Sequence, residues 1–468
     1  MTKFFLDQRG CAKNQVDGEI IISNLLGAGF EKAASADEAD LIIINSCGFI
    51  ESAKKESLDA LLGARKKYKD KKIILAGCLA QRYAKIFEKE LPEADGIFGN
   101  GDLSRAAAFA KKIMAGKRSV DTPAQAGVSC GERLELLSYK NSAYVKITEG
   151  CSNHCSFCAI PLIRGELRSR PAADVIKEIK GLLKRGIFEI NLIGQDLAAF
   201  GTENGGKTKT REGLSPLACL LQKISALKGN FWIRLLYIHP DHFNPDILDI
   251  LKKDARILPY FDIPFQSGDD KIILAMNRKN SASYYKKLVK NIRAQFPDAA
   301  LRTTFLAGFP GETEEAAANT LDFLQAIEPD WSGAFAYSKE EDTAAYKMKG
   351  QVPKKTAAAR VAALQGAQQK IMENRISRRV RQGKKFLEYD VLVEELVADP
   401  KGMESAQGQN EAAFYAIGRA WFQAPEVDGN VVIQYEKSQA AAKLVQPGAV
   451  VKVRAVAASG VDIYAELI

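Results

Sequence analysis

The stretch EGCSNHCSFCAIP, residues 149–161, holds three cysteines at the spacing CxxxCxxC: Cys151, Cys155 and Cys158. A four-iron, four-sulfur cluster normally takes four thiolates, so three clustered cysteines leave one iron without a protein ligand. That iron can chelate the amino and carboxylate groups of S-adenosylmethionine, whose reductive cleavage yields a 5′-deoxyadenosyl radical. The alternatives are a zinc site completed by His154 or three unrelated buried thiols, but zinc sites more often use CxxC pairs, and no second pair exists here.

The motif comes directly after the first of six strand-like segments, which amphipathic helical patterns mostly separate: 144–148, 188–194, 231–237, 260–265, 301–308 and 331–337. Six such units in a row predict an incomplete barrel or a wide, open parallel sheet. Phe157, just before the last cysteine, would help to cover a cluster from water. Gln195 and Asp196 end the second strand and could hold the methionyl end or the ribose of the nucleotide. For Asp196, an ordinary helix cap is the alternative.

The first part of the chain carries a second set of cysteines. Apolar runs at 3–8, 40–46 and 72–77 alternate with amphipathic helical stretches, which predicts a parallel sheet with helices on its faces. A cysteine follows each run, next to a glycine that permits close backbone approach: Cys11, Cys47 and Cys78. Because open α/β sheets place ligands at the carboxyl ends of strands, these cysteines suggest a second cluster with one free iron. Three small buried side chains are the alternative.

The rest of the chain divides into three segments. Residues 117–140 have weak periodicity and are predicted to be a linker. A long helix rich in Ala, Gln, Lys and Arg is expected at about 354–382. From Phe386 onward the hydrophobic period changes to two, which predicts about five short strands in a small antiparallel barrel.

Composition limits the class of protein. With 468 residues, 46% of them hydrophobic and 26% charged, the chain should form several globular domains. It has neither an apolar run of about eighteen residues nor a recognisable signal peptide, so we expect no membrane span and a cytoplasmic location. In that reducing compartment, cysteines favour metal or redox chemistry over disulfides. Cys130 and Cys219 stand outside both sets, and we assign neither a role.

Charge is unevenly distributed. Residues 354–385 contain ten Lys and Arg and one acid, a net charge of +9, whereas 386–468 contain twelve acids and six bases, a net charge of −6. An RNA-binding module should present a basic face to phosphates, so the acidic tail favours a basic protein partner. The basic helix argues the other way, since it could contact ribosomal RNA or tRNA.

Seven segments together resemble the methylthiotransferase family of radical S-adenosylmethionine enzymes: GCAKNQVDGE, INSCGFI, GCLAQRY, EGCSNHCSFCAIPLIRG, GQD, GFPGET and APEVDG. The resemblance runs along nearly the whole chain. It implies an α/β protein whose methylthiotransferase N-terminal domain spans 1–116, with the linker at 117–140. A radical S-adenosylmethionine domain, built as a partial (β/α)6 barrel and including the basic helix, would span 141–382. A small β-barrel, the TRAM domain, would span 383–468.

The resemblance also implies roles. Cys11, Cys47 and Cys78 would bind an auxiliary 4Fe-4S cluster, and Cys151, Cys155 and Cys158 the radical 4Fe-4S cluster. One S-adenosylmethionine would methylate a sulfur species at the auxiliary cluster. A second would supply the radical that removes hydrogen from an unactivated C–H bond, with an outside electron donor, so that the carbon takes up the methylthio group.

Two branches of the family differ in substrate. One modifies the β-carbon of an aspartate in ribosomal small-subunit protein S-twelve, and the other modifies adenosines in tRNA. CAKNQVD, CAIPLIRG, GQDL and PEVDG resemble the ribosomal-protein branch, whereas QSGDD at 266–270 is closer to the tRNA branch. We therefore expect the ribosomal protein as substrate, with tRNA as one alternative. A non-catalytic iron–sulfur protein of the ribosome is another.

Overall fold

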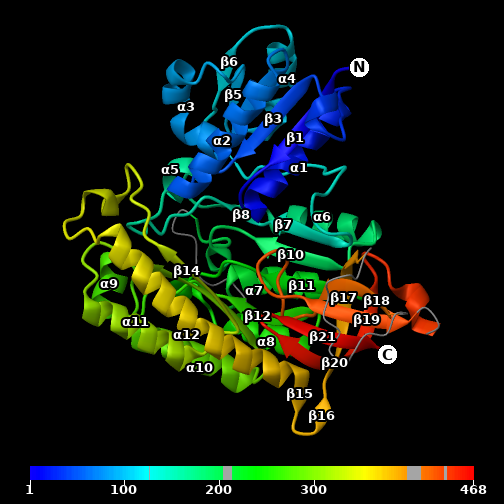
Figure 1. Cartoon of the computed structure of the whole chain (residues 1–468), viewed down its shortest axis with the longest axis vertical. Coiled ribbons are helices and arrows are strands. Elements are labelled where there is room, and N and C mark those ends of the chain that lie inside the picture. The colour runs from blue at the N-terminus through cyan, green and yellow to red at the C-terminus, as the bar shows by residue number, and fades with distance from the viewer. Residues whose placement is uncertain (126, 204–212, 398–412, 437–439) are drawn as a thin grey trace.

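The computed structural model describes residues 1–468 except 126, 204–212, 398–412 and 437–439. It contains an N-terminal α/β domain, a central six-stranded sheet with outer helices, and a small C-terminal barrel (Figure 1). None of the helices in these ranges has the length and apolar composition needed to cross a membrane.

The N-terminal domain has a parallel sheet in the order β2-β1-β3-β4-β5-β6. The strands are β1 (Lys3–Gln8), β2 (Glu31–Lys32), β3 (Leu41–Ser46), β4 (Lys72–Gly77), β5 (Gly96–Phe98) and β6 (Ser119–Asp121). Its two faces are covered by α1 (Ala12–Gly27) with α4 (Ala106–Met114), and by α2 (Glu51–Lys67) with α3 (Cys78–Glu90). β3 and β4 are buried along nearly their whole length, which explains why these two strands are continuous apolar runs.

One strand lies where the sequence predicts a linker. β6 pairs with β5 and extends the sheet into the segment 117–140. Its residues, Ser119, Val120 and Asp121, are only partly buried at the edge of the sheet. A three-residue edge strand with one apolar side chain carries no hydrophobic period, so sequence patterns miss it.

The central sheet keeps its strands in chain order, and all neighbouring pairs are parallel. They are β7 (Ser142–Lys146), β10 (Glu189–Ile193), β11 (Trp232–Leu235), β12 (Ile257–Asp262), β13 (Ala300–Ala307) and β14 (Trp331–Ala336). The edge strands β7 and β14 do not pair, which confirms the partial barrel. The helices of this part are α5 (Ile160–Arg164), α6 (Ala172–Lys184), α7 (Pro216–Ser225), α8 (Asp246–Lys253), α9 (Asp270–Ala275), α10 (Ala282–Gln295) and α11 (Glu314–Ile327). A short ladder of β8 (Thr148–Glu149) and β9 (Arg168–Ser169) flanks the cysteine motif.

The long helix α12 (Lys354–Val380) packs against α11 and β14 and leads through the hairpin β15 (Arg381–Gln382) and β16 (Lys385–Phe386) to the small barrel. The barrel is closed, in the order β17-β18-β19-β21-β20. Its strands are β17 (Glu388–Leu396), β18 (Ala413–Arg419), β19 (Val431–Glu436), β20 (Val450–Ser459) and β21 (Asp462–Leu467). The predicted small barrel is confirmed, although β19 and β21 pair in parallel rather than antiparallel.

The small barrel packs against the central sheet through buried polar contacts. Arg419 of β18 pairs with Glu189, the first residue of β10, with 2.6 Å between Nη2 and Oε2. The Tyr260 hydroxyl donates to Asp428 at 2.6 Å, and the Trp331 indole N–H donates to the Phe422 carbonyl at 3.0 Å. The loop after β18 therefore covers part of the central sheet.

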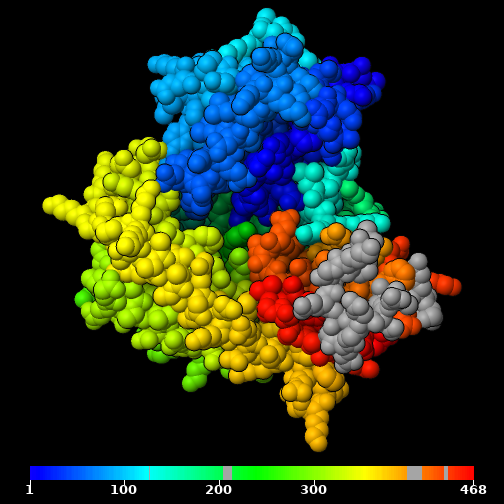
Figure 2. Space-filling model, in the orientation of Figure 1, coloured from blue at the N-terminus to red at the C-terminus, as the bar shows by residue number. Residues whose placement is uncertain are grey.

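The N-terminal domain lies across the carboxyl ends of the central strands. On the β7 side, Asp17 of α1 pairs with Lys146, and on the β14 side Lys54 and Arg82 both pair with Glu340. Figure 2 shows a hollow where the blue N-terminal domain meets the green, yellow and orange segments. Since cysteines follow the carboxyl ends of strands in both domains, this packing turns the two sets toward each other.

Candidate active site between two cysteine trios

The N-terminal trio consists of Cys11, Cys47 and Cys78. Cys11 caps the start of α1 after β1, Cys47 follows β3, and Cys78 is the first residue of α3 after β4. The glycines beside them are required: a Cβ on Gly10 would lie 2.9 Å from Cys47 Cβ, and Gly77, at φ 92°, would meet Asn45 Oδ1 at 2.5 Å. The trio is thus packed at one edge of the sheet, as the sequence predicts.

The environment of this trio suits thiolate ligands. Burial raises the pKa of Cys47 to about 12, and the neighbouring Cys78 adds to the effect. Burial also opposes ionisation of Cys11, but the charges of Lys13 and Arg164 and the backbone N–H groups at the start of α1 lower its pKa. None of the three is in a disulfide. Three thiols gathered at one crevice are a soft donor set that fits an iron–sulfur cluster.

The barrel trio consists of Cys151, Cys155 and Cys158, in the loop after β8. Backbone hydrogen bonds fix this loop: Cys151 N donates to Gly165 O at 3.1 Å, and Cys158 N to Cys155 O at 2.9 Å. Burial raises the pKa of both Cys151 and Cys158 to about 12. These thiols therefore stay neutral at pH 7 unless a metal supplies positive charge, and metal coordination deprotonates a thiol outright.

Phe157 packs into an apolar cluster with Ile272, Met276 and Phe309. It therefore anchors the loop of the barrel trio in apolar surroundings, which is consistent with the expectation that it covers a cluster from water. The direct role of Phe157 beside a cofactor stays a prediction.

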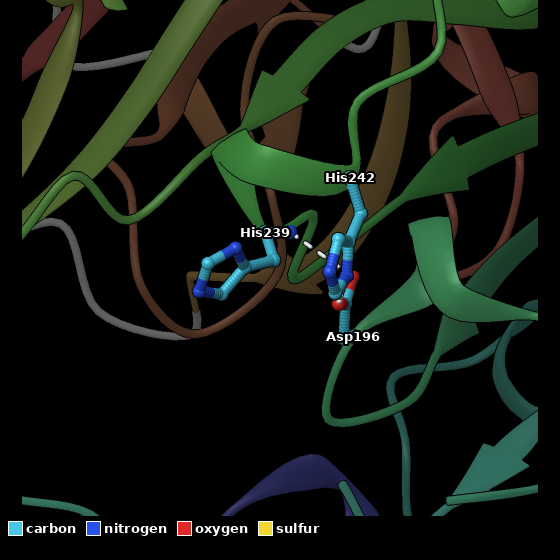
Figure 3. A group of neighbouring side chains, drawn as sticks. All are labelled: Asp196, His239 and His242. Carbon is cyan, nitrogen blue, oxygen red and sulfur yellow. Dashed lines mark hydrogen bonds and ion pairs between the residues drawn. The ribbon is translucent and has the colours of Figure 1, made fainter. Parts of the chain in front are cut away.

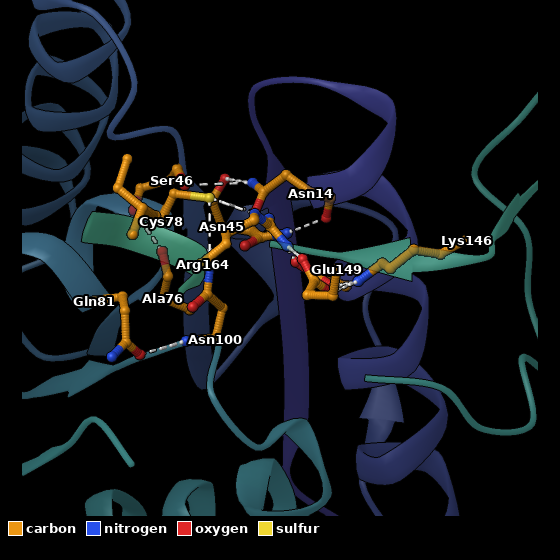
Figure 4. Close-up of polar contacts among 12 residues, drawn as sticks. Asn14, Asn45, Ser46, Ala76, Cys78, Gln81, Asn100, Lys146, Glu149 and Arg164 are labelled. Carbon is orange, nitrogen blue, oxygen red and sulfur yellow. Dashed lines mark hydrogen bonds and ion pairs between the residues drawn. The ribbon is translucent and has the colours of Figure 1, made fainter. Parts of the chain in front are cut away.

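The N-terminal trio contacts the segment that follows the barrel trio at the domain interface. Cys78 packs against Ala159 and Ile163, the residues that directly follow the barrel trio. Arg164, at the end of α5, donates to Cys78 Sγ at 3.1 Å (Figure 4). One side chain thus links the segment after the barrel trio to a member of the N-terminal trio, which makes the interface a single candidate site.

A buried ring of charges supports this link. Arg164 pairs with Glu149 at 2.5 Å and with Asp17 at 2.8 Å, and Lys146 pairs with the same two carboxylates at 2.6 and 2.5 Å. All four side chains are at most 4% exposed. Burial alone would raise the pKa of Glu149, but Arg164 and Lys146 hold it at about 2. The ring joins the two domains beside both trios.

Asp196 occupies a polar corner beside the barrel trio. It caps a short helix by accepting from Ala198 N, as one of the two sequence interpretations predicts. It also accepts from His239 N at 3.1 Å and pairs with His242 Nδ1 at 2.6 Å (Figure 3). In Figure 3 the His239 ring points away from Asp196, and its Nε2 lies 3.8 Å from Cys155 Sγ.

A cavity of about 240 Å³ opens between Cys151 and this corner. Among its lining residues are Asn153, Asp196, His239 and His242. From the sequence alone, His239 and His242 could be catalytic, but ordinary loop histidines with satisfied hydrogen bonds are the favoured interpretation. Their position beside Cys155 places them in the surroundings of the candidate site.

Gln195 has a buried side-chain oxygen, Oε1, with no hydrogen-bond partner among the described residues. Buried polar atoms without partners are rare in folded proteins, so this atom is a candidate to receive a hydrogen bond from a ligand. Asp196, by contrast, already uses its carboxylate on protein donors. We therefore favour Gln195 over Asp196 as a contact for S-adenosylmethionine.

Replacement of Gln195 by Leu is expected to raise the dissociation constant for S-adenosylmethionine about 3- to 10-fold, the loss of one neutral hydrogen bond. Equilibrium binding to the cluster-loaded enzyme measures this, with iron content as the control for an intact site. Unchanged affinity in a variant with full iron content would show that Gln195 does not contact the nucleotide.

The remaining cysteines lie outside the interface. Cys130 is exposed in the segment before β7, and Cys219 belongs to α7. Neither has a role assigned here.

Comparison with known proteins supports the domain order. Residues 3–99 match the model described as "Uncharacterized protein family UPF0004", 145–324 match the radical SAM superfamily, and 388–468 match the TRAM domain. The fold is similar to that of the radical S-adenosylmethionine methyltransferase TsrM from Kitasatospora setae, with a TM-score of 0.52 and 14% identity over 71% of this chain and 73% of that one. Fold and site together define a radical S-adenosylmethionine enzyme with an added domain at each end.

Curated relatives narrow the class. The chain is 50% identical to the ribosomal protein uS12 methylthiotransferase RimO of Treponema denticola, over 98% of this chain and 99% of the relative. It is 37% identical to the protein of that name from Carboxydothermus hydrogenoformans, over 93% and 94% of the two chains. The chain therefore belongs to the RimO family of methylthiotransferases, and the predicted family is confirmed.

Proposed function

We propose that this enzyme inserts a methylthio group at the β-carbon of an aspartate in uS12, the ribosomal small-subunit protein S-twelve. The observation that carries the proposal is the contact of Cys78, from one cysteine trio, with the segment that directly follows the other trio, in a chain whose relatives bear that name. One trio alone would account for radical formation, and the second provides a place to hold the sulfur that is transferred.

The cofactors are two 4Fe-4S clusters and S-adenosylmethionine. Cys151, Cys155 and Cys158 hold the radical cluster, and Cys11, Cys47 and Cys78 hold the auxiliary cluster. When bound, these groups supply the 5′-deoxyadenosyl radical and the methylated sulfur. The chain places both trios beside the interface between the two domains, and an external electron donor completes the system.

Charge favours a protein substrate over RNA. Part of the positive charge of α12 is neutralised internally, because Arg360 pairs with Glu312 at 2.8 Å, and Arg375 and Arg379 pair with Asp330 at 3.0 and 2.6 Å. The helix therefore presents less free positive charge to phosphates than its composition indicates. A ribosomal substrate also places the enzyme in the cytoplasm.

The deciding experiment offers both substrates to the same enzyme. Reconstituted enzyme with S-adenosylmethionine, reductant and sulfide should add the mass of one methylthio group to uS12, and tRNA should stay unmodified. Modification of tRNA with uS12 untouched would assign the chain to the other branch. Absence of 5′-deoxyadenosine under reducing conditions would instead favour a non-catalytic iron–sulfur protein.

A further inference from the structure

Lys13 is a buried lysine at the interface between the two trios. It is the second residue of α1, two positions after Cys11, and is 7% exposed. Its ammonium group lies over the ring of Tyr237, which follows β11 at the carboxyl end of the central sheet. Lys13 therefore reaches from the N-terminal domain into the mouth of the partial barrel.

Lys13 lacks a direct carboxylate partner among the described residues, although Cys11 and Asp262 lie close enough for their charges to act on it. Within the part of the chain that the structure describes, its Nζ forms no ion pair with a carboxylate and no hydrogen bond. Lys146, the other buried lysine at this interface, shows the usual arrangement, with two carboxylates at 2.5 and 2.6 Å. A buried ammonium without a direct ion pair is costly, so such a group is a candidate to bind an anionic ligand.

Tyr237 is held in an unfavourable backbone conformation beneath this lysine. Its φ is 67°, in the left-handed region that aromatic residues rarely adopt. Two hydrogen bonds fix it there: Tyr237 N donates to Asp262 Oδ2 at 3.0 Å, and Leu197 N donates to Tyr237 O at 2.9 Å. Strain of this kind concentrates at ligand sites, where it fixes the direction of a side chain.

We propose that Lys13 binds the side-chain carboxylate of the substrate aspartate and thereby selects an acidic residue over a neutral one. This inference rests on the proposed function. The ammonium group donates to the carboxylate, while the Tyr237 ring limits where the carboxylate can lie. Since Lys13 stands two residues from Cys11, a carboxylate held there keeps the adjacent β-carbon next to the N-terminal trio. Lys13 is thus a specificity-determining residue.

Another role would be a counter-charge for the auxiliary cluster. That role makes no distinction between substrates, because it depends only on the thiolates of the N-terminal trio. Discrimination between an aspartate and an asparagine at the modified position therefore separates the two roles.

The test measures binding to enzyme loaded with both clusters and S-adenosylmethionine, without reductant. The probes are uS12 and a uS12 variant that carries asparagine at the modified position. We expect the unaltered enzyme to bind the aspartate form about 10- to 100-fold more tightly, as expected for a hydrogen bond between charged groups. Lys13→Met should bind both forms equally, near the affinity for asparagine, and Lys13→Arg should keep much of the preference.

Cluster integrity is the control. Lys13→Met should keep about eight irons per chain, as two four-iron clusters require, and should still form 5′-deoxyadenosine under reducing conditions. If Lys13→Met loses iron, Lys13→Gln takes its place, since Gln keeps a polar end without the charge. An unchanged preference for aspartate in the neutral variant, or an equal loss for both forms, would overturn the inference. If the unaltered enzyme modifies only tRNA, the proposed function itself fails.

Discussion

Replacing Cys151, Cys155 and Cys158 together with alanine will abolish 5′-deoxyadenosine formation and reduce iron from about eight to about four atoms per chain, because one of two four-iron clusters is lost. The three cysteines share one loop whose backbone is fixed by neighbouring segments, so their removal changes ligands more than structure. Product analysis by chromatography and an iron assay on anaerobically reconstituted protein measure both effects.

The matched variant replaces Cys11, Cys47 and Cys78. It should also lose about four irons, yet it should still cleave S-adenosylmethionine, since the barrel trio remains. No methylthio product should form on uS12, because under the proposed function the sulfur is held at the N-terminal trio. The two variants thus separate radical formation from sulfur transfer. Full iron content in either variant, or methylthiolation by the second, would contradict the assignment of the trios.

Hydrophobic pattern was sufficient to predict the arrangement of the cysteines. β3 and β4 are short apolar runs buried nearly throughout, β1 buries Phe4 and Leu6, and each predicted strand lies within one residue of the observed one. Because parallel strands end at a common edge, the residues after them had to converge. The same reasoning predicted that Cys151, Cys155 and Cys158 follow the first strand of the central sheet.

Pairing between distant segments could not be predicted in this way. Asp17 and Lys146 are separated by 129 positions, and nothing in the local sequence of either marks the other as its partner. Lys13 lies in the segment CAKNQVD, whose polar residues are of types usually found at the surface. Nothing in this segment predicts that tertiary packing buries Lys13. Asp428 likewise meets Tyr260 through a loop of another domain. Charged residues have no periodic signature, so their burial depends on how the domains dock.

The buried charge ring leads to the second large effect. Replacing Arg164 with Met removes one cation from a ring of two cations and two carboxylates, and also removes the donor to Cys78 Sγ. Removing one partner of a buried ion pair typically costs 3–5 kcal/mol, and in this ring two buried carboxylates would be left to share Lys146 alone. We expect a loss of about that size at the interface between α1 and α5.

Hydrogen exchange of the backbone amides of α1, measured on anaerobic cluster-loaded enzyme, reports this loss of stability locally. A local measurement is needed because a chain with three domains need not unfold in one step. The matched variant combines Arg164→Met with Asp17→Asn, so that one positive and one negative charge leave together and the ring is neutral again. In this double variant the amides of α1 should be better protected from exchange than in Arg164→Met alone, by a coupling free energy of about 1–3 kcal/mol.

If the effects of the two substitutions are instead additive, the ring does not act as a unit. The domains would then be held mainly by apolar contacts such as that of Cys78 with Ala159 and Ile163. Rescue by the second substitution would show that charge neutrality at the interface, rather than the Arg164 side chain itself, keeps the two domains docked.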